Sequence, residues 1–231
     1  DGGTNGDLAV SGQLNADADG ESSTARGGEI NLTGRNIAIQ GADLSADGAG
    51  GGTIRVGGGL QHDRLAGGEL TRTASGVWID SASTLSADAG ISGPGGTISI
   101  YAADALRSGG RLSARGGSLA GNGGFIETSA GWLSLRGSPD TSAARGLGGS
   151  WLIDPLDIDI VATPSTNVTG GPIFTPTAGP STLFVGDLRD AMQTNSSVSV
   201  VTAGTVGPGT GRIRLLTTLR GHKETVRCLA F

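Results

Sequence analysis

The sequence predicts an all-β protein: a right-handed parallel β-helix of about six coils, followed by a small C-terminal extension that contains one short helix. Three observations predict this fold. Glycine makes up 44 of the 231 residues, pairs of glycine recur at spacings of 16 to 28 residues, and short runs of alternating apolar residues follow these pairs. Repeats of this length are typical of stacked coils. Parallel crossovers are nearly always right-handed, which sets the expected hand of the coil.

The repeat between Gly27 and Gly51 shows how one coil is built. Three short apolar runs with a period of two follow the glycine pair, and each run predicts a strand with one apolar face. The expected inward residues of this repeat are Ile30, Leu32, Ile37, Ile39 and Leu44. A single coil cannot bury its apolar face alone, so we expect neighbouring coils to stack and align these residues in ladders.

The later repeats follow the same pattern. The triplet Leu-Ser-Ala recurs at positions 44, 85 and 112 and marks the third strand of a coil. The expected inward residues of the later coils are Ile98, Ile100, Leu112, Ile126, Leu133, Leu135, Trp151, Ile153 and Ile158. Gly-Gly and Asp-Gly corners are expected to supply the positive-φ residues that tight bends need. The region between Gly57 and Gly76 is too short for a full coil, so we predict a loop there.

The domain organisation follows from changes in composition. Residues 1–161 carry the repeats, and residues 162–182 form a linker rich in proline, glycine and threonine. Residues 183–215 are expected to hold a short helix, capped by Asp187, and further strands. Residues 216–231 form a separate C-terminal segment.

Composition also excludes several classes of protein. The net charge of −5 and the pI of about 4.9 argue against nucleic acid as a partner. The longest apolar runs fall well short of a membrane span. The single cysteine, Cys228, excludes an internal disulfide, and two histidines with one cysteine do not make a zinc site. The glycine-rich strings match neither of the common phosphate-binding motifs, so no cofactor is expected.

One stretch carries a family resemblance. Residues 123–135 read Gly-Gly-Phe-Ile-Glu-Thr-Ser-Ala-Gly-Trp-Leu-Ser-Leu, and residues 151–155 read Trp-Leu-Ile-Asp-Pro before an alternating strand. This combination resembles the filamentous-haemagglutinin-like exoproteins of bacterial two-partner secretion, over roughly residues 1–214. The resemblance implies a large secreted β-helical adhesin that is exported through a dedicated outer-membrane transporter. The Asn-Pro motifs of that family's secretion domain do not occur here, so we expect this chain to lie downstream of it.

The last residues resemble something different. The Gly221-His222 pair and the stretch Val226 to Phe231 look like the opening of a WD-repeat propeller blade. A blade needs four strands, and this segment holds about one of them.

The densest group of candidate site residues is Asp154, Asp157 and Asp159. Strand alternation places the last two side by side on an outer face. They could form a weak calcium site or a catalytic carboxylate pair. Alternatively, they form a solvated face whose like charges discourage edge pairing, and this interpretation is favoured.

Two further groups of residues could take part in binding or catalysis. Trp78, Trp132 and Trp151 could stack on sugars, but Trp151 is better explained as an inward residue and the other two as corner or outward residues. The group His62-Asp63-Arg64 could belong to a hydrolytic site, although no nucleophile elbow accompanies it.

These observations favour a non-enzymatic structural and adhesive segment of a secreted, cell-surface exoprotein. Its expected partners are host-cell or matrix glycans and proteins, and the outer-membrane transporter during export. One alternative is a carbohydrate-active β-helix enzyme such as a polysaccharide lyase, for which the chain offers only scattered basic residues: Arg55, Arg107, Arg111 and Arg115. A second alternative, an interaction scaffold, rests on the C-terminal segment alone.

Overall fold

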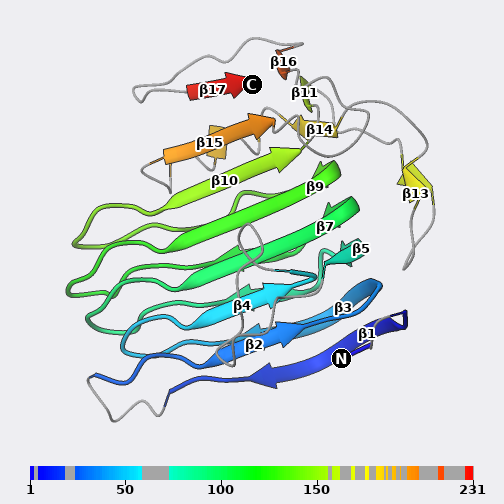
Figure 1. The fold of residues 1–231 in the computed structure, drawn as a ribbon. Coiled ribbons are helices and arrows are strands. Elements are labelled where there is room, and N and C mark those ends of the chain that lie inside the picture. The colour runs from blue at the N-terminus through cyan, green and yellow to red at the C-terminus, as the bar shows by residue number, and fades with distance from the viewer. Residues whose placement is uncertain are drawn as a thin grey trace.

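The chain is described from a computed structural model. The structure describes residues 1–2, 5–18, 24–58, 73–155, 158–161, 168–169, 175–176, 181–184, 186, 189–190, 193, 197–202, 213–215 and 227–230. The expected all-β class is confirmed: the strands form one large sheet in which every described pairing is parallel, plus a separate antiparallel pair, β12 (Val168–Thr169) and β13 (Thr175–Pro176). Figure 1 shows the strands stacked one above another from the N-terminal end.

The parallel pairings fall into three columns. The first column contains β2 (Glu29–Leu32), β4 (Thr53–Val56), the first half of β7 (Thr97–Ser108), the first half of β9 (Phe125–Leu135), β10 (Ser150–Pro155), β15 (Ser197–Thr202) and β17 (Arg227–Ala230). The second column contains the first halves of β1 (Asp7–Asn15) and β3 (Asn36–Ser45), then β5 (Ala74–Ile79), the second halves of β7 and β9, β14 (Ser181–Phe184), β11 (Ile158–Val161) and β16 (Ile213–Leu215). The third column contains the second halves of β1 and β3, β6 (Thr84–Ser86) and β8 (Arg111–Ser113).

The chain passes through these columns in a fixed order. Residues 29–32 lie in the first column, residues 36–39 in the second and residues 42–45 in the third, after which the chain returns to the first column at Thr53. A bend separates the second and third columns, and the pairing of β1 with β3 changes register there. Gly12 and Gly41 stand at this bend with φ of 81° and 56°, a conformation that glycine adopts without steric cost.

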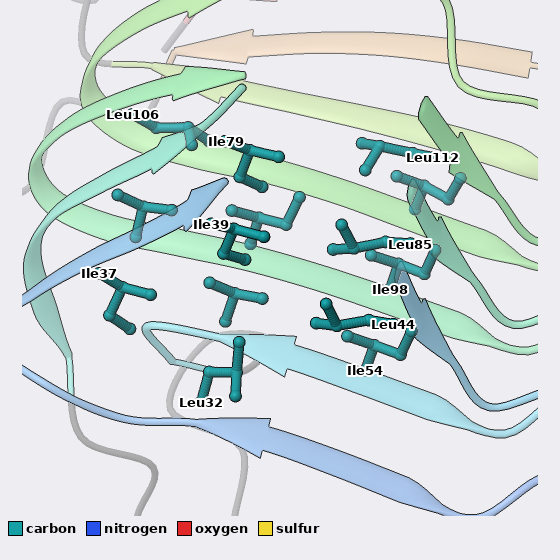
Figure 2. Close-up of a cluster of buried hydrophobic side chains, with 14 of the residues drawn as sticks. Leu32, Ile37, Ile39, Leu44, Ile54, Ile79, Leu85, Ile98, Leu106 and Leu112 are labelled. Carbon is teal, nitrogen blue, oxygen red and sulfur yellow. The ribbon is translucent and has the colours of Figure 1, made fainter. Parts of the chain in front are cut away.

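The core consists of aliphatic side chains that repeat along each column. In the first column Ile30, Ile54, Ile98, Ile126 and Trp151 are aligned in register. In the third column Leu44, Leu85 and Leu112 are aligned in the same way. Figure 2 shows Ile54 and Ile98 of the first column and Leu44, Leu85 and Leu112 of the third column, with their side chains in the space between the strands. Each fully buried side chain of this size stabilises the fold by about 1.5–3 kcal/mol.

The inward residues expected from the alternation are buried wherever the structure describes their exposure. These are Ile30, Leu32, Ile37, Ile39, Leu44, Ile98, Ile100, Leu112, Ile126, Leu133, Leu135, Trp151 and Ile153. The side chain of Ile158 lies outside the described residues, and only the backbone of its strand β11 is placed.

The recurring glycine pairs that the structure describes do not supply the positive φ angles that the sequence suggested. Among the described residues the positive-φ glycines are at positions 12, 41, 57, 58, 93, 121 and 137, and the expectation holds for the adjacent pair Gly57-Gly58. The pairs are needed because the backbones of neighbouring repeats approach closely. A Cβ atom on Gly124 would lie 2.1 Å from the carbonyl oxygen of Gly96, and one on Gly149 would lie 1.9 Å from that of Gly124. The repeating glycines therefore allow backbone-to-backbone stacking.

Several expectations fall outside the described residues. Most of the predicted loop between Gly57 and Gly76 does so. In the C-terminal extension, residues 186, 189, 190 and 193 are helical, whereas Asp187 is not described. The backbone of β17 pairs in parallel with β15, so part of the C-terminal segment takes the edge of the large sheet.

Candidate functional site

Two carboxyl groups on neighbouring strands form the most chemically distinctive cluster. Glu127 of β9 pairs in register with Leu152 of β10, and Asp154 stands two positions farther along β10, opposite Ser129. Residues two apart share a face of the sheet, so Glu127 and Asp154 lie on the same face, with Cα atoms about 8 Å apart by strand spacing and rise. Of the three aspartates considered as a candidate site, Asp154 has a described side chain, and it takes part in this cluster.

Glu127 is the buried member of the pair. Its residue is only 2% exposed. The hydroxyl of Ser129 donates to Oε1 at 2.7 Å, and the hydroxyl of Ser99 donates to Oε2 at 3.2 Å. Both carboxylate oxygens therefore have a hydroxyl donor, as a buried polar group requires.

The electrostatics of this cluster favour the protonated form of Glu127. Burial raises the pKa of its carboxyl, this effect outweighs the two serine hydrogen bonds that lower it, and the negative charge of Asp154 raises it further. Burial likewise raises the pKa of Tyr101, with smaller contributions from the charges of Asp154 and Glu127. A carboxyl with a raised pKa beside a second carboxyl is the arrangement that general acid–base chemistry uses. The burial of Glu127, however, leaves very little of its side chain open to a substrate.

The side chains of the other two aspartates lie outside the described part of the structure. Asp157 lies outside the described residues, and only the backbone of Asp159 is placed, in β11 opposite Thr182 and Arg214. Within the described part of the chain, no group of three or more His, Cys, Asp or Glu residues is placed to hold a metal ion.

A second polar feature, which the sequence analysis did not identify, runs along the third column. The residue after each Leu-Ser-Ala or Leu-Asn-Ala triplet is Asp17, Asp47, Asp88 and then Arg115. We call the three aspartates the carboxylate column. Each carboxylate accepts two hydrogen bonds from the next coil, one from a serine hydroxyl and one from the backbone N–H of the equivalent residue.

The charges of this column interact with one another. Burial raises the pKa of Asp47, outweighing its hydrogen bonds from Ser86 and the Asp88 backbone, and the charges of Asp88 and Asp17 raise it further. A groove of about 510 Å³ runs beside the column, with Ile91 among its lining residues. The signal for this feature was present in the sequence, since the third position after each recurring leucine is charged.

The three tryptophans do not form one surface. Trp151 lies in the core, where its Nε1 donates to Thr128 Oγ1 at 3.1 Å, which agrees with its interpretation as an inward residue. Trp132 is also buried, but it belongs to a separate small cluster with Ala105, against which the partly buried Trp78 packs.

The basic residues considered for a polysaccharide site are spread over different parts of the surface. Arg55 is bound to Glu29 on the first column, and Arg115 is bound to Asp88 on the third. Arg107 and Arg111 are exposed in β7 and β8. The group His62-Asp63-Arg64 lies outside the described residues.

Comparison with known proteins adds no assignment to this geometry. No protein-family model matches the chain, and no curated protein matches it. Among the described residues, no helix is both long enough and apolar enough to cross a membrane.

Proposed function

We propose that residues 1–161 form a closed, right-handed parallel β-helix of about six coils. The support for this is the fixed order in which the chain visits the three columns, together with the aligned inward side chains. A chain that repeats the sequence of first, second and third column, always in parallel register, winds about one axis. With strands about 4.8 Å apart, such a helix is a rod about 30 Å long.

The functional proposal depends on this rod. The chain would be a non-enzymatic structural and adhesive segment of a secreted bacterial surface exoprotein. The observation that carries it is the uninterrupted parallel register from β2 through β4, β7 and β9 to β10. Such a ladder presents similar outer surfaces at regular intervals, which suits many weak contacts made together. The proposed partners are host-cell or matrix glycans and proteins, and the proposed exporter is an outer-membrane transporter of the two-partner type.

The test compares multivalent and monovalent binding. Purified protein is immobilised on beads at high density and presented to arrays of glycans and matrix proteins, and the monomer is measured on the same arrays. We expect strong retention of the beads and weak binding of the monomer, without any change in the glycans. Equal, weak binding in both formats to every array member would contradict the adhesive proposal.

A second candidate function rests on the pair of Glu127 and Asp154. Two carboxyls on adjacent coils, one of them with a raised pKa, favour hydrolysis or lysis of a polysaccharide. The experiment incubates the chain with a panel of polysaccharides and measures reducing ends and unsaturated products. Activity lost in Glu127→Gln and Asp154→Asn, but kept in the exposed control Asp104→Asn, would establish an enzyme and displace the adhesive proposal.

A further inference from the structure

The outer face of the second column carries a partly exposed aromatic side chain, Trp78. In β5 the buried residues Val77 and Ile79 stand on either side of Trp78, so alternation directs Trp78 away from the core. Trp78 is partly buried and packs against the small cluster of Ala105 and Trp132. Because Trp132 is itself only 6% exposed, Trp78 is the tryptophan through which this cluster reaches the surface.

Small residues stand beside Trp78 in the sheet. Ala38 of β3 is aligned with Trp78 on one side, and Gly76, two positions earlier in β5, occupies the same face without a side chain. Ala38 and Ala105 are both buried. The indole of Trp78 therefore rests on a packed support, with no other large side chain at the aligned position in β3. An aromatic ring held in this way binds flat apolar surfaces, of which the C–H face of a sugar ring is one.

A cation lies next to Trp78 on the following strand. Arg107 of β7 is aligned in register with Trp78, and it is exposed. No carboxylate among the described residues forms an ion pair with Arg107. Neighbouring strands are about 4.8 Å apart, so the Arg107 guanidinium can reach a substituent on the edge of a ring stacked on Trp78.

A second cation extends this part of the surface. Arg136 directly follows β9 and is exposed, and its backbone N–H donates to the carbonyl oxygen of Ser108, the residue after Arg107. In the described part of the chain, Arg136 also has no ion-pair partner. Figure 1 shows β5, β7 and β9 as neighbours in the stack, so Trp78, Arg107 and Arg136 come from three consecutive strands.

The nearby carboxylates leave these arginines available. Asp80, two residues after Trp78, is engaged by the Ser83 hydroxyl at 2.6 Å and by the backbone N–H of Gly41 at 3.1 Å. Asp104 is exposed and stands three residues before Arg107, about 10 Å away by the rise of a strand. The surface around Trp78 is therefore suited to an anion, although the chain as a whole has a net charge of −5.

We propose that Trp78 and Arg107 form a binding subsite for an acidic saccharide, in which a sugar ring stacks on the Trp78 indole and its carboxylate binds the Arg107 guanidinium. A guanidinium binds a carboxylate through two parallel N–H···O hydrogen bonds, which fixes the orientation of the ring. Arg136 binds the acidic group of a further residue of the same saccharide. The subsite rests on the adhesive function proposed above and assigns it one ligand class, glycans that contain uronic acids.

An acidic peptide is a poorer ligand for this surface. Its carboxylates would satisfy the two arginines, but they would leave Trp78 without a flat apolar partner. A neutral glycan would stack on Trp78 and leave Arg107 unpaired. Only a ligand that joins a sugar ring to a carboxylate uses both side chains, and this combination distinguishes uronates from the other two classes.

The test titrates the whole, isotopically labelled chain with a hyaluronan hexasaccharide, whose glucuronate residues carry carboxylates and no sulfate. The indole N–H signals of the tryptophans are followed by nuclear magnetic resonance, and Trp78→Phe assigns the signal of Trp78. We expect a saturable shift of the Trp78 signal and none of the Trp151 signal, because Trp151 is buried and donates to Thr128. The carboxyl-reduced hexasaccharide should bind about tenfold more weakly, since it cannot form the charged hydrogen bonds. A hexaglutamate peptide should not shift the Trp78 signal.

Variants of the protein identify the two side chains. Arg107→Gln and Trp78→Leu should each weaken binding of the hexasaccharide about tenfold in isothermal titration calorimetry. Arg145→Gln is the matched control, because it removes the same charge from an exposed arginine in a corner loop, and it should bind as the wild type does. Trp78→Phe keeps an aromatic ring and should retain most of the affinity. If Trp78→Leu lowers the melting temperature, the exposed Arg107→Gln decides the matter.

The outcomes separate this subsite from the adhesive proposal. Beads that are retained on uronate-containing glycans equally well with wild-type chain, Arg107→Gln and Trp78→Leu would overturn the subsite and leave adhesion standing. Binding of the hexasaccharide at Trp78, with no retention of beads on any array, would support the subsite and contradict adhesion. The subsite is also overturned by an unmoved Trp78 signal, by equal binding of the carboxyl-reduced hexasaccharide, or by equal binding of hexaglutamate.

Discussion

Arg115 binds Asp88 with its side chain and its backbone at once. Its Nε and Nη2 atoms donate to Oδ2 of Asp88 at 2.8 and 2.6 Å, while its backbone N–H donates to Oδ1 at 2.7 Å. Arg115 occupies the position that aspartate holds in the preceding coils, so a cation follows the third carboxylate of the column. The side-chain hydrogen bond that Arg115 donates to Asp88, and then the charge of Asp88, raise the pKa of Arg115. The pair thus links two consecutive coils outside the apolar core.

Replacing Asp88 should destabilise the fold measurably. Asp88→Ala removes the acceptor of Ser113 and of Arg115, and we expect a loss of about 1–3 kcal/mol in the free energy of unfolding. The comparison variant is Asp43→Ala, an exposed aspartate on β3, for which we expect a change within about 0.5 kcal/mol. Urea denaturation followed by circular dichroism measures both. Equal effects of the two substitutions would show that the column does not join the coils.

Ionisation of Glu127 should oppose folding. Because its pKa is raised in the folded state, its contribution to stability is greatest in acid and is lost as the pH rises from its ordinary value of 4.5 through the raised value. Glu127→Gln cannot ionise, so the variant should gain stability relative to the wild type as the pH increases over this window. Unfolding free energies of the two proteins, measured from about pH 4 to pH 8, test the sign. A relative gain that shrinks with rising pH would contradict it.

The contribution of Asp80 to stability should change with pH in the opposite direction to that of Glu127. Burial alone would raise its pKa, but hydrogen bonds from the Ser83 hydroxyl and from the backbone N–H groups of Gly41, Ala82 and Ser83 together lower it. A lowered pKa gives stability that is present above the unfolded value and is lost as the pH falls through the folded value. Asp80→Asn should therefore reduce stability at neutral pH and lose less on acidification than the wild type does. If the free energy of unfolding of Asp80→Asn changed with pH in the same way as that of the wild type, the ionised Asp80 would not stabilise the fold.

A methyl group at a stacked glycine should disrupt the coil spacing. In Gly124→Ala the new Cβ would lie 2.1 Å from the Gly96 oxygen, so two coils must separate, and we expect a cost of at least about 1–3 kcal/mol. Gly109→Ala is the matched control, because its Cβ would meet nothing closer than 3.5 Å. Thermal melting of both variants distinguishes them, and a Gly124→Ala protein as stable as the control would refute the close approach.

A charge in the core should remove cooperative unfolding near the affected coil. Ile39 is fully buried, so Ile39→Asp places an unpaired carboxylate in a thin apolar core. The neighbouring Gln40 is exposed, and Gln40→Asp adds the same charge without burying it. We expect a broad, early melting transition for the first variant alone. Wild-type-like melting of Ile39→Asp would mean that its side chain does not point inward.

Much of the column arrangement was predictable from the sequence because its signals are local. Alternation of apolar residues identified Ile37, Ile39 and their equivalents, and the recurring triplet identified the third column at Leu44 and Leu85. A period of two decides which side chains share a face, and this needs no knowledge of the neighbouring coil.

Other features depend on contacts between coils and could not be predicted in the same way. The need for glycine at position 124 comes from the carbonyl of Gly96, 28 residues away, and not from its own φ angle. The sequence did not identify Glu127 as a site residue, because its partner Asp154 stands on the next strand of the column, far from it in sequence. In the second column β14 lies between β9 and β11, although it follows β11 in sequence. The composition before it indicates a linker and gives no sign of that insertion.

The stacking of coils is tested most directly by distances along the first column. Glu29, Thr53, Thr97, Phe125 and Ser150 are aligned in register, one per strand. Spin labels are placed on Glu29 with Phe125, and on Glu29 with Ser150, after Cys228→Ser, and are measured by double electron–electron resonance. Stacked coils predict narrow backbone separations of about 14 and 19 Å, which differ by one strand spacing. Broad distributions, or two distances that do not differ by one spacing, would contradict the stacked arrangement on which the proposed function rests.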